Sequence, residues 1–181
     1  MDKKSIRLEY INIRNKIDNK DIKSNIIFNK IIKDKDYINS KYIALYKSLN
    51  SEVDTNKLIK YSLDLGKIVL LPRVVDDNLY FYKITYNEKL EVSKFGVEEP
   101  LNNIKNLISS DIIDLVIVPG VVFDYNKNRL GFGRGYYDRF LKDLDAITIG
   151  ICFDEQLSNK LIVDEFDVPV QKVITNKRII S

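Results

Sequence analysis

Three glycines at alternate positions, Gly131, Gly133 and Gly135, mark the segment of this chain best suited to chemistry. Their conformational freedom lets successive backbone amides point into one concavity, and a concavity of this kind ahead of a helix binds phosphate. Arg129 and Arg134 add guanidinium groups whose geometry suits phosphate oxygens. The pattern is neither GxGxxG nor GxxxxGK[ST], so it identifies no nucleotide-binding family by itself, and a tight structural loop is the alternative.

The residues after this loop predict the first turn of a helix that begins near Tyr136. Asp138 in that turn would complement the helix dipole, which is worth about 0.3–1 kcal/mol. Equally, it could bind magnesium beside phosphates, since magnesium favours one or two carboxylates plus phosphate oxygens. Adjacent helical side chains diverge by about 100°, so of Tyr136 and Tyr137 we expect one in the core and one against a ligand.

Two further groups of polar residues are candidates for binding. Lys3, Arg7 and Arg14 recur at spacings that form one basic stripe, which borders the apolar face of an N-terminal helix. From there they can reach a cleft beside a sheet, although a solvated basic edge is the simpler interpretation. Glu52 follows a predicted strand, where it either caps the next helix or accepts hydrogen bonds from a ligand's N–H groups.

The composition excludes several kinds of site. The chain has no histidine and one cysteine, which removes Ser-His-Asp and Cys-His catalysis, histidine general bases and structural zinc sites. We expect that cysteine, Cys152, to be an inert core residue because it closes an apolar run. Any chemistry must rest on Lys, Arg, Asp, Glu, Tyr, backbone amides and a hard metal ion. The net charge of only +3 argues against a nucleic-acid partner.

Length and patterning predict one domain over residues 1–181. With one cysteine no internal disulfide forms, which fits a reducing compartment, and we expect a cytoplasmic protein. The charged N-terminus is unlike a signal peptide. No apolar run approaches the 18 or so residues of a membrane span, so we expect no membrane partner.

The elements that must position these residues alternate along the chain. Helical periodicity predicts two helices in the first 35 residues, one from residue 54 or 55 to Gly66, a short one over 101–109 and one from Tyr136. Short apolar runs predict strands over 42–46, 68–71 (ended by Pro72), 79–84, 115–118, 146–152 and 172–175, and 87–100 is expected to be a long loop. This alternation predicts an α/β fold, a three-layer sandwich with a mostly parallel central sheet that binds ligands at the strands' carboxyl ends.

Two consecutive segments, Val118–Asp124 (VPGVVFD) and Asn128–Asp138 (NRLGFGRGYYD), resemble the signature of the 5-formyltetrahydrofolate cyclo-ligase family, also called methenyltetrahydrofolate synthetases. Other landmarks follow in the same order, at residues 3–7, 51–55, 66–73, 95–100 and 167–169. The resemblance therefore spans nearly the whole chain, and its central motif is long and specific.

The resemblance implies a Rossmann-like central sheet and a defined reaction. ATP and Mg²⁺ would drive the cyclisation of 5-formyltetrahydrofolate to 5,10-methenyltetrahydrofolate, with release of ADP and phosphate, through a phosphorylated formyl (imidate phosphate) intermediate. The substrate supplies its own nucleophile at each step, so a site without histidine suffices. The partners would be small molecules, and the protein would act as a monomer.

The same resemblance assigns roles to individual residues. Arg134 and Tyr137 match catalytic positions, and Asp138 and Asp167 match magnesium positions. The positions that match ATP contacts are Lys3, Lys4, Arg7, Arg129, Gly131, Phe132, Gly133, Arg134, Gly135, Tyr136 and Tyr137. Those that match folate contacts are Lys47, Leu49, Glu52, Arg134, Gly135 and Tyr136.

Three residues depart from the family pattern. Lys47 stands where an apolar residue is common, Gln171 where an acidic one is common, and Phe166 where a polar one is common. Two other functions remain open at this point. One is a sugar-phosphate isomerase or transferase that uses the glycine loop without ATP, and the other is a non-catalytic folate- or nucleotide-binding paralogue.

Overall fold

A central eight-stranded sheet organises the chain in the computed structural model, which describes residues 2–181. Its strands, in spatial order, are β13 (Ile179–Ile180), β12 (Lys172–Ile174), β10 (Ile147–Ile151), β7 (Leu115–Val118), β1 (Tyr42–Ala44), β2 (Ile68–Val75), β3 (Asn78–Lys83) and β6 (Leu107–Ile108). The strands from β12 to β2 pair in parallel, and β13, β3 and β6 join antiparallel at the two edges. The predicted mixed α/β fold with a mostly parallel central sheet is confirmed.

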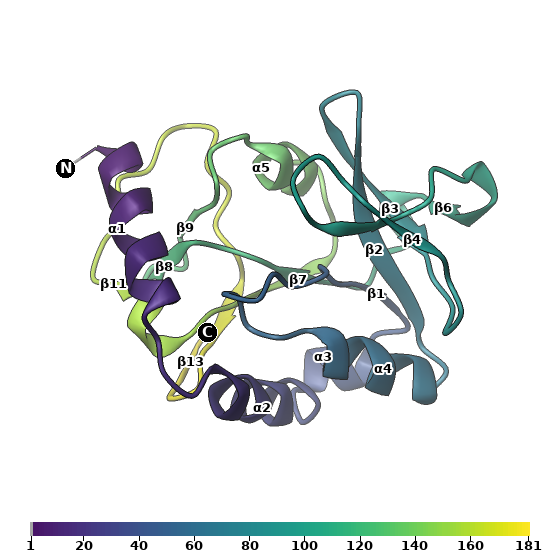
Figure 1. Cartoon of the computed structure of the whole chain (residues 1–181), viewed down its shortest axis with the longest axis horizontal. Helices are drawn as coiled ribbons and strands as arrows, with labels where there is room; N and C mark the ends of the chain where they lie inside the picture. The colour runs from purple at the N-terminus through teal and green to yellow at the C-terminus, as the bar shows by residue number, and fades with distance from the viewer. Residues whose placement is uncertain (1) are drawn as a thin grey trace.

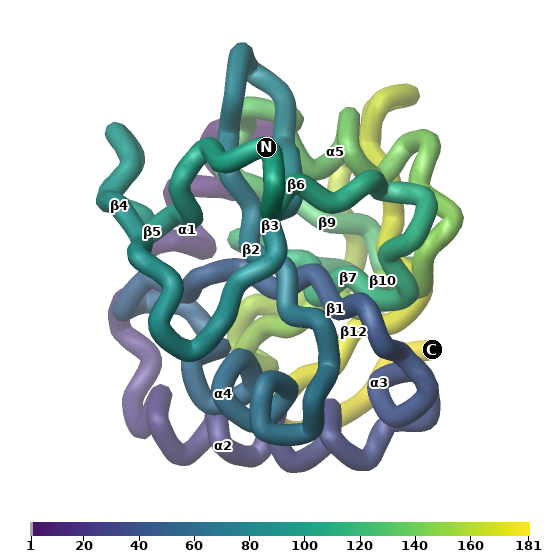
Figure 2. The backbone as a smooth tube through the Cα atoms, turned by 90° about the vertical axis from the view of Figure 1, so that its right-hand side faces the viewer, coloured from purple at the N-terminus to yellow at the C-terminus, as the bar shows by residue number. Residues whose placement is uncertain are grey.

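The helices lie on both faces of this sheet (Figure 1, Figure 2). They are α1 (Lys3–Asn15), α2 (Lys20–Ile31), α3 (Lys35–Asn39), α4 (Asn56–Asp64) and α5 (Tyr136–Leu141), with the 3-10 turns η1 (Ile104–Asn106), η2 (Ser110–Ile112) and η3 (Asp154–Gln156). In both views α2, α3 and α4 cover one face, and α5 lies on the opposite side.

Strand β7 shows why the apolar runs form the centre of the sheet. All its residues are inaccessible to solvent. Leu115 and Ile117 pack in the core beneath α2–α4, whereas Val116 and Val118 pack in a second core on the α5 side. A parallel strand buried on both faces needs apolar residues at every position. The sequence of this strand is therefore an unbroken apolar run and does not alternate between apolar and polar residues.

A smaller three-stranded sheet extends the fold at one end, where α1 covers it (Figure 1). It is formed by β11 (Leu157–Ser158), β8 (Val122–Asp124) and β9 (Arg129–Leu130). Ile6 and Tyr10 of α1 pack against Val122 and Leu130 of this sheet. That contact places the N-terminal helix beside the loop that follows β9.

Two predictions for the segment between residues 87 and 109 were wrong. The expected loop contains the hairpin β4 (Leu90–Val92) and β5 (Glu98–Pro100), which Arg73 of β2 holds through a 2.8 Å hydrogen bond from Nη1 to the Pro100 carbonyl. The expected helix over 101–109 is instead η1 and the edge strand β6, whose residues pair with Phe81 and Tyr82. At β6, pairing with the distant strand β3 overrides local preference, whereas β4 and β5 form a hairpin with each other.

Strand β2 also continues past Pro72, which was expected to end it. Pro72 pairs with Phe81 of β3, while the pairing with β1 extends only to Leu70. The missing N–H of proline therefore removes no bond to β1, as is usual where a strand has one neighbour. This extension forms part of a wall of the cavity described below.

Apart from the helix expected over 101–109, the predicted helices are present. α4 begins after its N-cap Thr55, and Gly66 follows it with a φ of 72°. In α2, Ile27 and Phe28 are buried and Ile22 is 62% exposed. α3 was not predicted at all.

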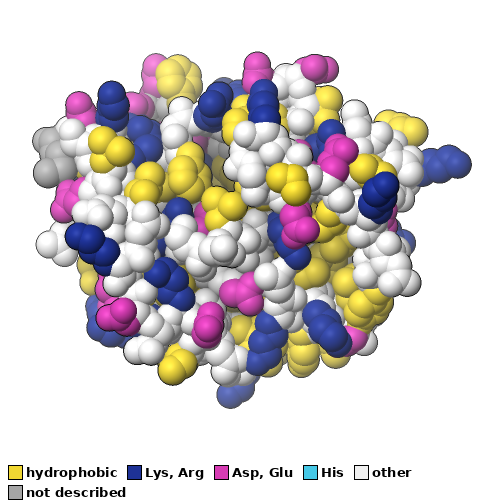
Figure 3. All heavy atoms as spheres, viewed as in Figure 1, with side chains coloured by type: hydrophobic (Ala, Val, Ile, Leu, Met, Phe, Trp, Pro, Cys, Tyr) yellow, Lys and Arg dark blue, Asp and Glu magenta, His cyan; other side chains and the backbone are white. Residues whose placement is uncertain are grey.

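Among residues 2–181, no helix combines the length and apolar character needed to cross a lipid bilayer. On the face shown in Figure 3, basic and acidic side chains are interspersed rather than gathered by sign.

Candidate active site

The glycine loop connects β9 to α5 and has the backbone that its sequence predicts. Gly133 and Gly135 have φ values of 96° and 69°, in the left-handed region that other residues rarely adopt. Gly135 is also the N-cap of α5. Arg7 of α1 reaches this loop, and its Nε donates a 2.7 Å hydrogen bond to the Gly131 carbonyl. Of the basic stripe of α1, Arg7 therefore contacts the glycine loop.

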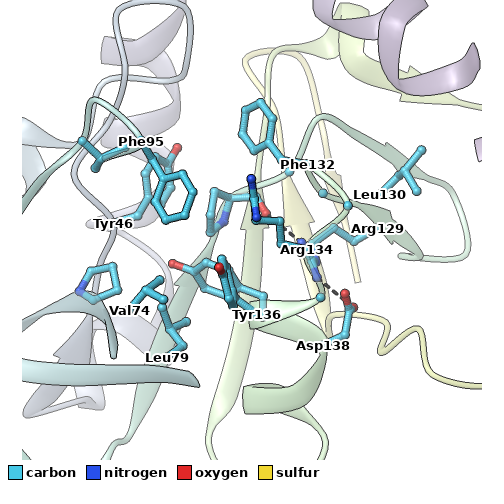
Figure 4. A pocket seen from close by; sticks show the side chains of 18 of the residues that line it. Tyr46, Val74, Leu79, Phe95, Arg129, Leu130, Phe132, Arg134, Tyr136 and Asp138 are labelled. Atoms are coloured by element: carbon cyan, nitrogen blue, oxygen red, sulfur yellow. Dashed lines mark hydrogen bonds and ion pairs between the residues drawn. The ribbon is translucent and has the colours of Figure 1, made fainter. Parts of the chain in front are cut away.

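A cavity of about 380 Å³ opens beside the loop, above the carboxyl ends of β1 and β7. Figure 4 shows Tyr46, Val74, Leu79 and Phe95 along one wall, facing the residues of the glycine loop. Of the site residues predicted from sequence, those that line the cavity are Arg7, Lys47, Leu49, Glu52, Arg129, Gly131, Phe132, Gly133, Arg134, Gly135, Tyr136, Tyr137, Asp138 and Asp167. Lys3 and Lys4 are absent from the lining, and Lys4 is exposed.

The apolar wall opposite the loop was missed by the sequence analysis. Val74 comes from β2 beyond Pro72, where that strand was expected to stop, and Leu79 comes from the start of β3, the strand predicted over 79–84. Phe95 comes from the β4–β5 turn, and its position inside the landmark over 95–100 was an available signal. Tyr46 lies two residues after the last residue of β1, at the end of the apolar run that predicted that strand.

Arg134 and Arg129 differ sharply in their surroundings. Arg134 extends into the space between the walls, with its guanidinium carbon 5.1 Å from the centre of the Phe95 ring (Figure 4). Arg129 is buried, and its Nη2 donates a 2.8 Å hydrogen bond to Oδ1 of Asp138. Arg134 is therefore the loop arginine free to meet a ligand, whereas Arg129 braces the base of the loop.

Glu52 is nearly buried at the end of the cavity nearest β1, and it does not cap a helix. Its Oε2 accepts a 2.9 Å hydrogen bond from the Leu49 amide, while the N-cap of α4 is Thr55. Burial raises the pKa of Glu52, although the Leu49 amide and the nearby Arg14 guanidinium oppose the rise. A carboxylate held in this way retains unused lone pairs for the N–H groups of a ligand.

Both tyrosines at the start of α5 line the cavity, so the expectation of one in the core and one against a ligand was too simple. Tyr136 lies near Phe95, with ring centres 6.2 Å apart. Tyr137 also packs on the core, and its buried hydroxyl has no hydrogen-bond partner in the described chain. Burial raises the pKa of Tyr137, so that hydroxyl stays protonated and available as a donor.

The two predicted magnesium ligands, Asp138 and Asp167, line the same cavity as the glycine loop. Each is already paired with a cation, Asp138 with Arg129 and Asp167 with Lys3. Within residues 2–181, no cluster of three or more acidic or cysteine side chains could hold a metal ion alone. Two hard oxygen donors beside a phosphate loop nevertheless suit magnesium, which takes its remaining ligands from phosphates and water.

Of the three residues that depart from the family pattern, only Lys47 lines the cavity. Its Nζ donates a 2.6 Å hydrogen bond to Oδ1 of Asn56 and lies 3.4 Å from Oε2 of Glu98. Lys47 therefore links α4 to the β4–β5 hairpin along the edge of the cavity. The side chain of Gln171 accepts a hydrogen bond from the Thr148 amide, and Phe166 is exposed.

Comparisons with known proteins agree with this geometry. The chain matches the model of the 5-formyltetrahydrofolate cyclo-ligase family over residues 1–176. It is 30% identical to the mouse 5-formyltetrahydrofolate cyclo-ligase, covering 82% of this chain and 80% of the mouse protein, and 32% identical to that of Escherichia coli K12, covering 76% and 79%.

Two solved structures have the same architecture. The 5,10-methenyltetrahydrofolate synthetase of Aquifex aeolicus superposes with a TM-score of 0.87 and 30% identity, covering 99% of this chain and 92% of that one. The enzyme of the same name from Mycoplasma pneumoniae gives a TM-score of 0.79 and 26% identity, covering 97% and 99%. The motif, the fold and these relatives together show that this chain belongs to the 5-formyltetrahydrofolate cyclo-ligase family.

Proposed function

We propose that this cavity binds 5-formyltetrahydrofolate, ATP and Mg²⁺ together and couples ATP cleavage to ring closure of the folate. As a member of its family, the protein is a ligase that cyclises 5-formyltetrahydrofolate to 5,10-methenyltetrahydrofolate. The observation that carries the ATP-dependent mechanism is the placement of the glycine loop opposite Glu52 in one cavity. A phosphate donor and a pterin ring can therefore meet without moving between sites.

The chemistry requires alignment and charge stabilisation rather than a covalent residue. The formyl oxygen on N5 attacks the γ-phosphorus of ATP, the bond to the bridging oxygen breaks and ADP leaves. N10 then attacks the activated formyl carbon, the carbon–oxygen bond breaks, and phosphate leaves with 5,10-methenyltetrahydrofolate as the product. ADP, phosphate and the methenyl compound account for all atoms of the two substrates, once N10 has given up its proton.

Individual residues have distinct tasks in this scheme. Arg134 stabilises the charge on the transferred phosphoryl group, while Arg7 and the loop amides hold the phosphate chain. Glu52 accepts hydrogen bonds from the pterin N–H groups, and the partnerless Tyr137 hydroxyl donates one to the reacting substrates. Asp138 and Asp167 would hold Mg²⁺, which when bound neutralises charge on the phosphate oxygens.

The remaining assignments are also proposals. Lys3 pairs with Asp167, so its proposed contact with ATP requires that ion pair to open or to be shared with a phosphate. Lys4 is exposed and would act at the mouth of the site. We further propose that residues 1–181 form one catalytic domain and that the protein acts as a cytoplasmic monomer, which analytical ultracentrifugation and cell fractionation would test.

One assay tests the proposal. The near-ultraviolet absorbance of the methenyl product is followed after the purified protein is mixed with 5-formyltetrahydrofolate, ATP and Mg²⁺. We expect absorbance to rise only when all three are present. A rise without ATP would refute the coupling, and a flat trace with correctly folded protein would favour a non-catalytic paralogue or a sugar-phosphate enzyme.

A variant then tests the role of the loop arginine. Arg134→Ala should slow turnover far more than it weakens folate binding, because its charge acts mainly in the transition state. Equal losses in kcat and in folate affinity would contradict this role. Arg178→Ala, which removes an arginine outside the cavity lining, is the matched control.

A further inference from the structure

Arg14 is a buried, charged residue to which the proposed mechanism assigns no role. It lies in the last turn of α1, its side chain is 3% exposed, and it is absent from the lining of the cavity. The sequence placed it on the same basic stripe as Arg7, where a solvated edge was the simpler interpretation. The structure instead places its guanidinium behind the cavity, between two residues that do line it.

Those two residues lie on different parts of the site. Nη1 of Arg14 is 3.4 Å from Oε1 of Glu52, which is the nearly buried carboxylate at the end of β1. The guanidinium carbon of Arg14 lies 5.3 Å from the centre of the Phe132 ring, which belongs to the glycine loop. Arg14 therefore connects the carboxylate proposed to bind folate with the loop proposed to bind ATP.

The surroundings of Glu52 explain why this carboxylate needs a cation. The Leu49 amide binds its Oε2, and the Tyr46 and Tyr137 phenols that face it are neutral. Within the described chain, Arg14 is the one cationic side chain at ion-pair distance from Glu52. Without it, desolvation would favour the protonated carboxyl, and a protonated carboxyl accepts ligand N–H groups less well.

The same contacts fix the direction of the carboxylate. The Leu49 amide engages Oε2 and Arg14 engages Oε1, which leaves one further lone pair on each oxygen for a ligand. Two parallel acceptors suit the adjacent ring and amino N–H groups of a pterin. Within residues 2–181, the buried Nε of Arg14 has no hydrogen-bond partner, an arrangement that costs stability.

We propose that Arg14 is a positioning residue for folate recognition, which holds the Glu52 carboxylate ionised and aimed at the cavity while its cation–π contact with Phe132 ties that carboxylate to the glycine loop. The inference rests on the proposed binding of the pterin by Glu52. It adds a residue that touches neither substrate and acts only through its two neighbours.

A double-mutant cycle tests the proposal. Isothermal titration with 5-formyltetrahydrofolate is carried out on the wild type, Arg14→Met, Glu52→Gln and the double variant. Arg14→Met should weaken folate binding by about tenfold or more, as expected for a lost charged hydrogen bond. The double variant should bind no more weakly than Glu52→Gln alone, because Arg14 acts through Glu52. Additive losses, or unchanged folate affinity in Arg14→Met, would overturn the proposal.

The pH dependence of folate affinity separates positioning from a general loss of structure. Affinity should decline on acidification at a higher pH in Arg14→Met than in the wild type, because Glu52 then protonates more readily. The groups facing Glu52 besides Arg14 are the Leu49 amide, Tyr46 and Tyr137, and the two phenols remain neutral throughout this range. Identical pH profiles in the two proteins would count against the inference.

Two controls complete the design. Arg178→Met removes an arginine that also pairs with a carboxylate, Asp154, and lies over an aromatic ring, that of Tyr125, but outside the cavity lining. Its folate affinity should match the wild type. If Arg14→Met fails to fold, Arg14→Gln decides the matter, because its amide can still hydrogen-bond to Glu52 but carries no charge, and unchanged folate affinity there overturns the proposal. Unchanged affinity in Glu52→Gln would instead refute the proposed folate role of Glu52 itself.

Discussion

Replacing Gly133 with alanine tests whether the placement of Arg7 matters for ATP. A Cβ at this position would lie 3.0 Å from the guanidinium carbon of Arg7, so that side chain must shift by a few tenths of an ångström. Gly66 provides the matched control, because it has a similarly positive φ of 72° and nothing within 4 Å of an added Cβ. Both variants strain the backbone, but only Gly133→Ala pushes on a residue of the site.

The loss of stability from backbone strain and the loss of ATP affinity from displacing Arg7 have separate expected magnitudes. A non-glycine residue in the left-handed region costs roughly 1–2 kcal/mol, so both variants should lose about that much free energy of unfolding. Displacing Arg7 also weakens its 2.7 Å hydrogen bond to the Gly131 carbonyl and the contact with ATP that we propose for it. A hydrogen bond to a charged group is worth about 1.5–3 kcal/mol, which corresponds to a loss of about 10- to 100-fold in ATP affinity.

The assay combines urea unfolding with isothermal titration of ATP and Mg²⁺ into each variant. We expect similar losses of stability in Gly133→Ala and Gly66→Ala, but weaker ATP binding only in Gly133→Ala. Equal ATP affinity in the two variants, at equal stability, would refute the reasoning. It would mean that the contact between α1 and the glycine loop has no part in nucleotide binding.

Three further predictions concern charge and burial. Asp167→Asn should raise the Mg²⁺ concentration needed for half-maximal turnover while leaving folate affinity within about twofold, and an unchanged magnesium requirement would exclude Asp167 as a ligand. Burial raises the pKa of Glu52 above its usual 4.5, so the ionised folded state is disfavoured. The free energy of unfolding of the wild type relative to Glu52→Gln should therefore fall as pH rises through the range just above 4.5, and a relative stability that rises there would contradict the assigned sign. Burial also raises the pKa of the Cys152 thiol, which should react with a thiol reagent at neutral pH only after denaturation, as a colorimetric titration with and without guanidinium would show.

The sequence by itself determined the features that depend on local pattern. The unbroken apolar run over 115–118 specified a strand buried on both faces, and β7 is the centre of the sheet. The alternate glycines specified a loop with positive φ at Gly133 and Gly135, followed by a helix. The absence of histidine restricted the chemistry to groups that the cavity does present.

The tertiary structure alone decided the opposite wall and the extent of the edge strands. The sequence ended β2 at Pro72, and nothing local revealed that a strand with one neighbour tolerates proline there. Val74 was consequently not recognised as a lining residue, and nothing in the local pattern indicated that Leu79 and Phe95 would join it. The β2–β3 hairpin and the β4–β5 hairpin that packs on β2 form this wall, and local propensity does not reveal which side of a cavity such hairpins will face.

The tertiary structure also decided which charges are free. Three arginine side chains of identical chemistry have different surroundings. Arg129 pairs with Asp138 and Arg14 pairs with Glu52, whereas Arg134 faces the cavity. A side chain's role depends on whether its partner lies within a few ångströms, because Coulomb energy and desolvation both change steeply over that distance. The spacing of residues in the sequence determines on which face of a helix a charged side chain lies. Only the folded chain determines which group lies opposite that side chain.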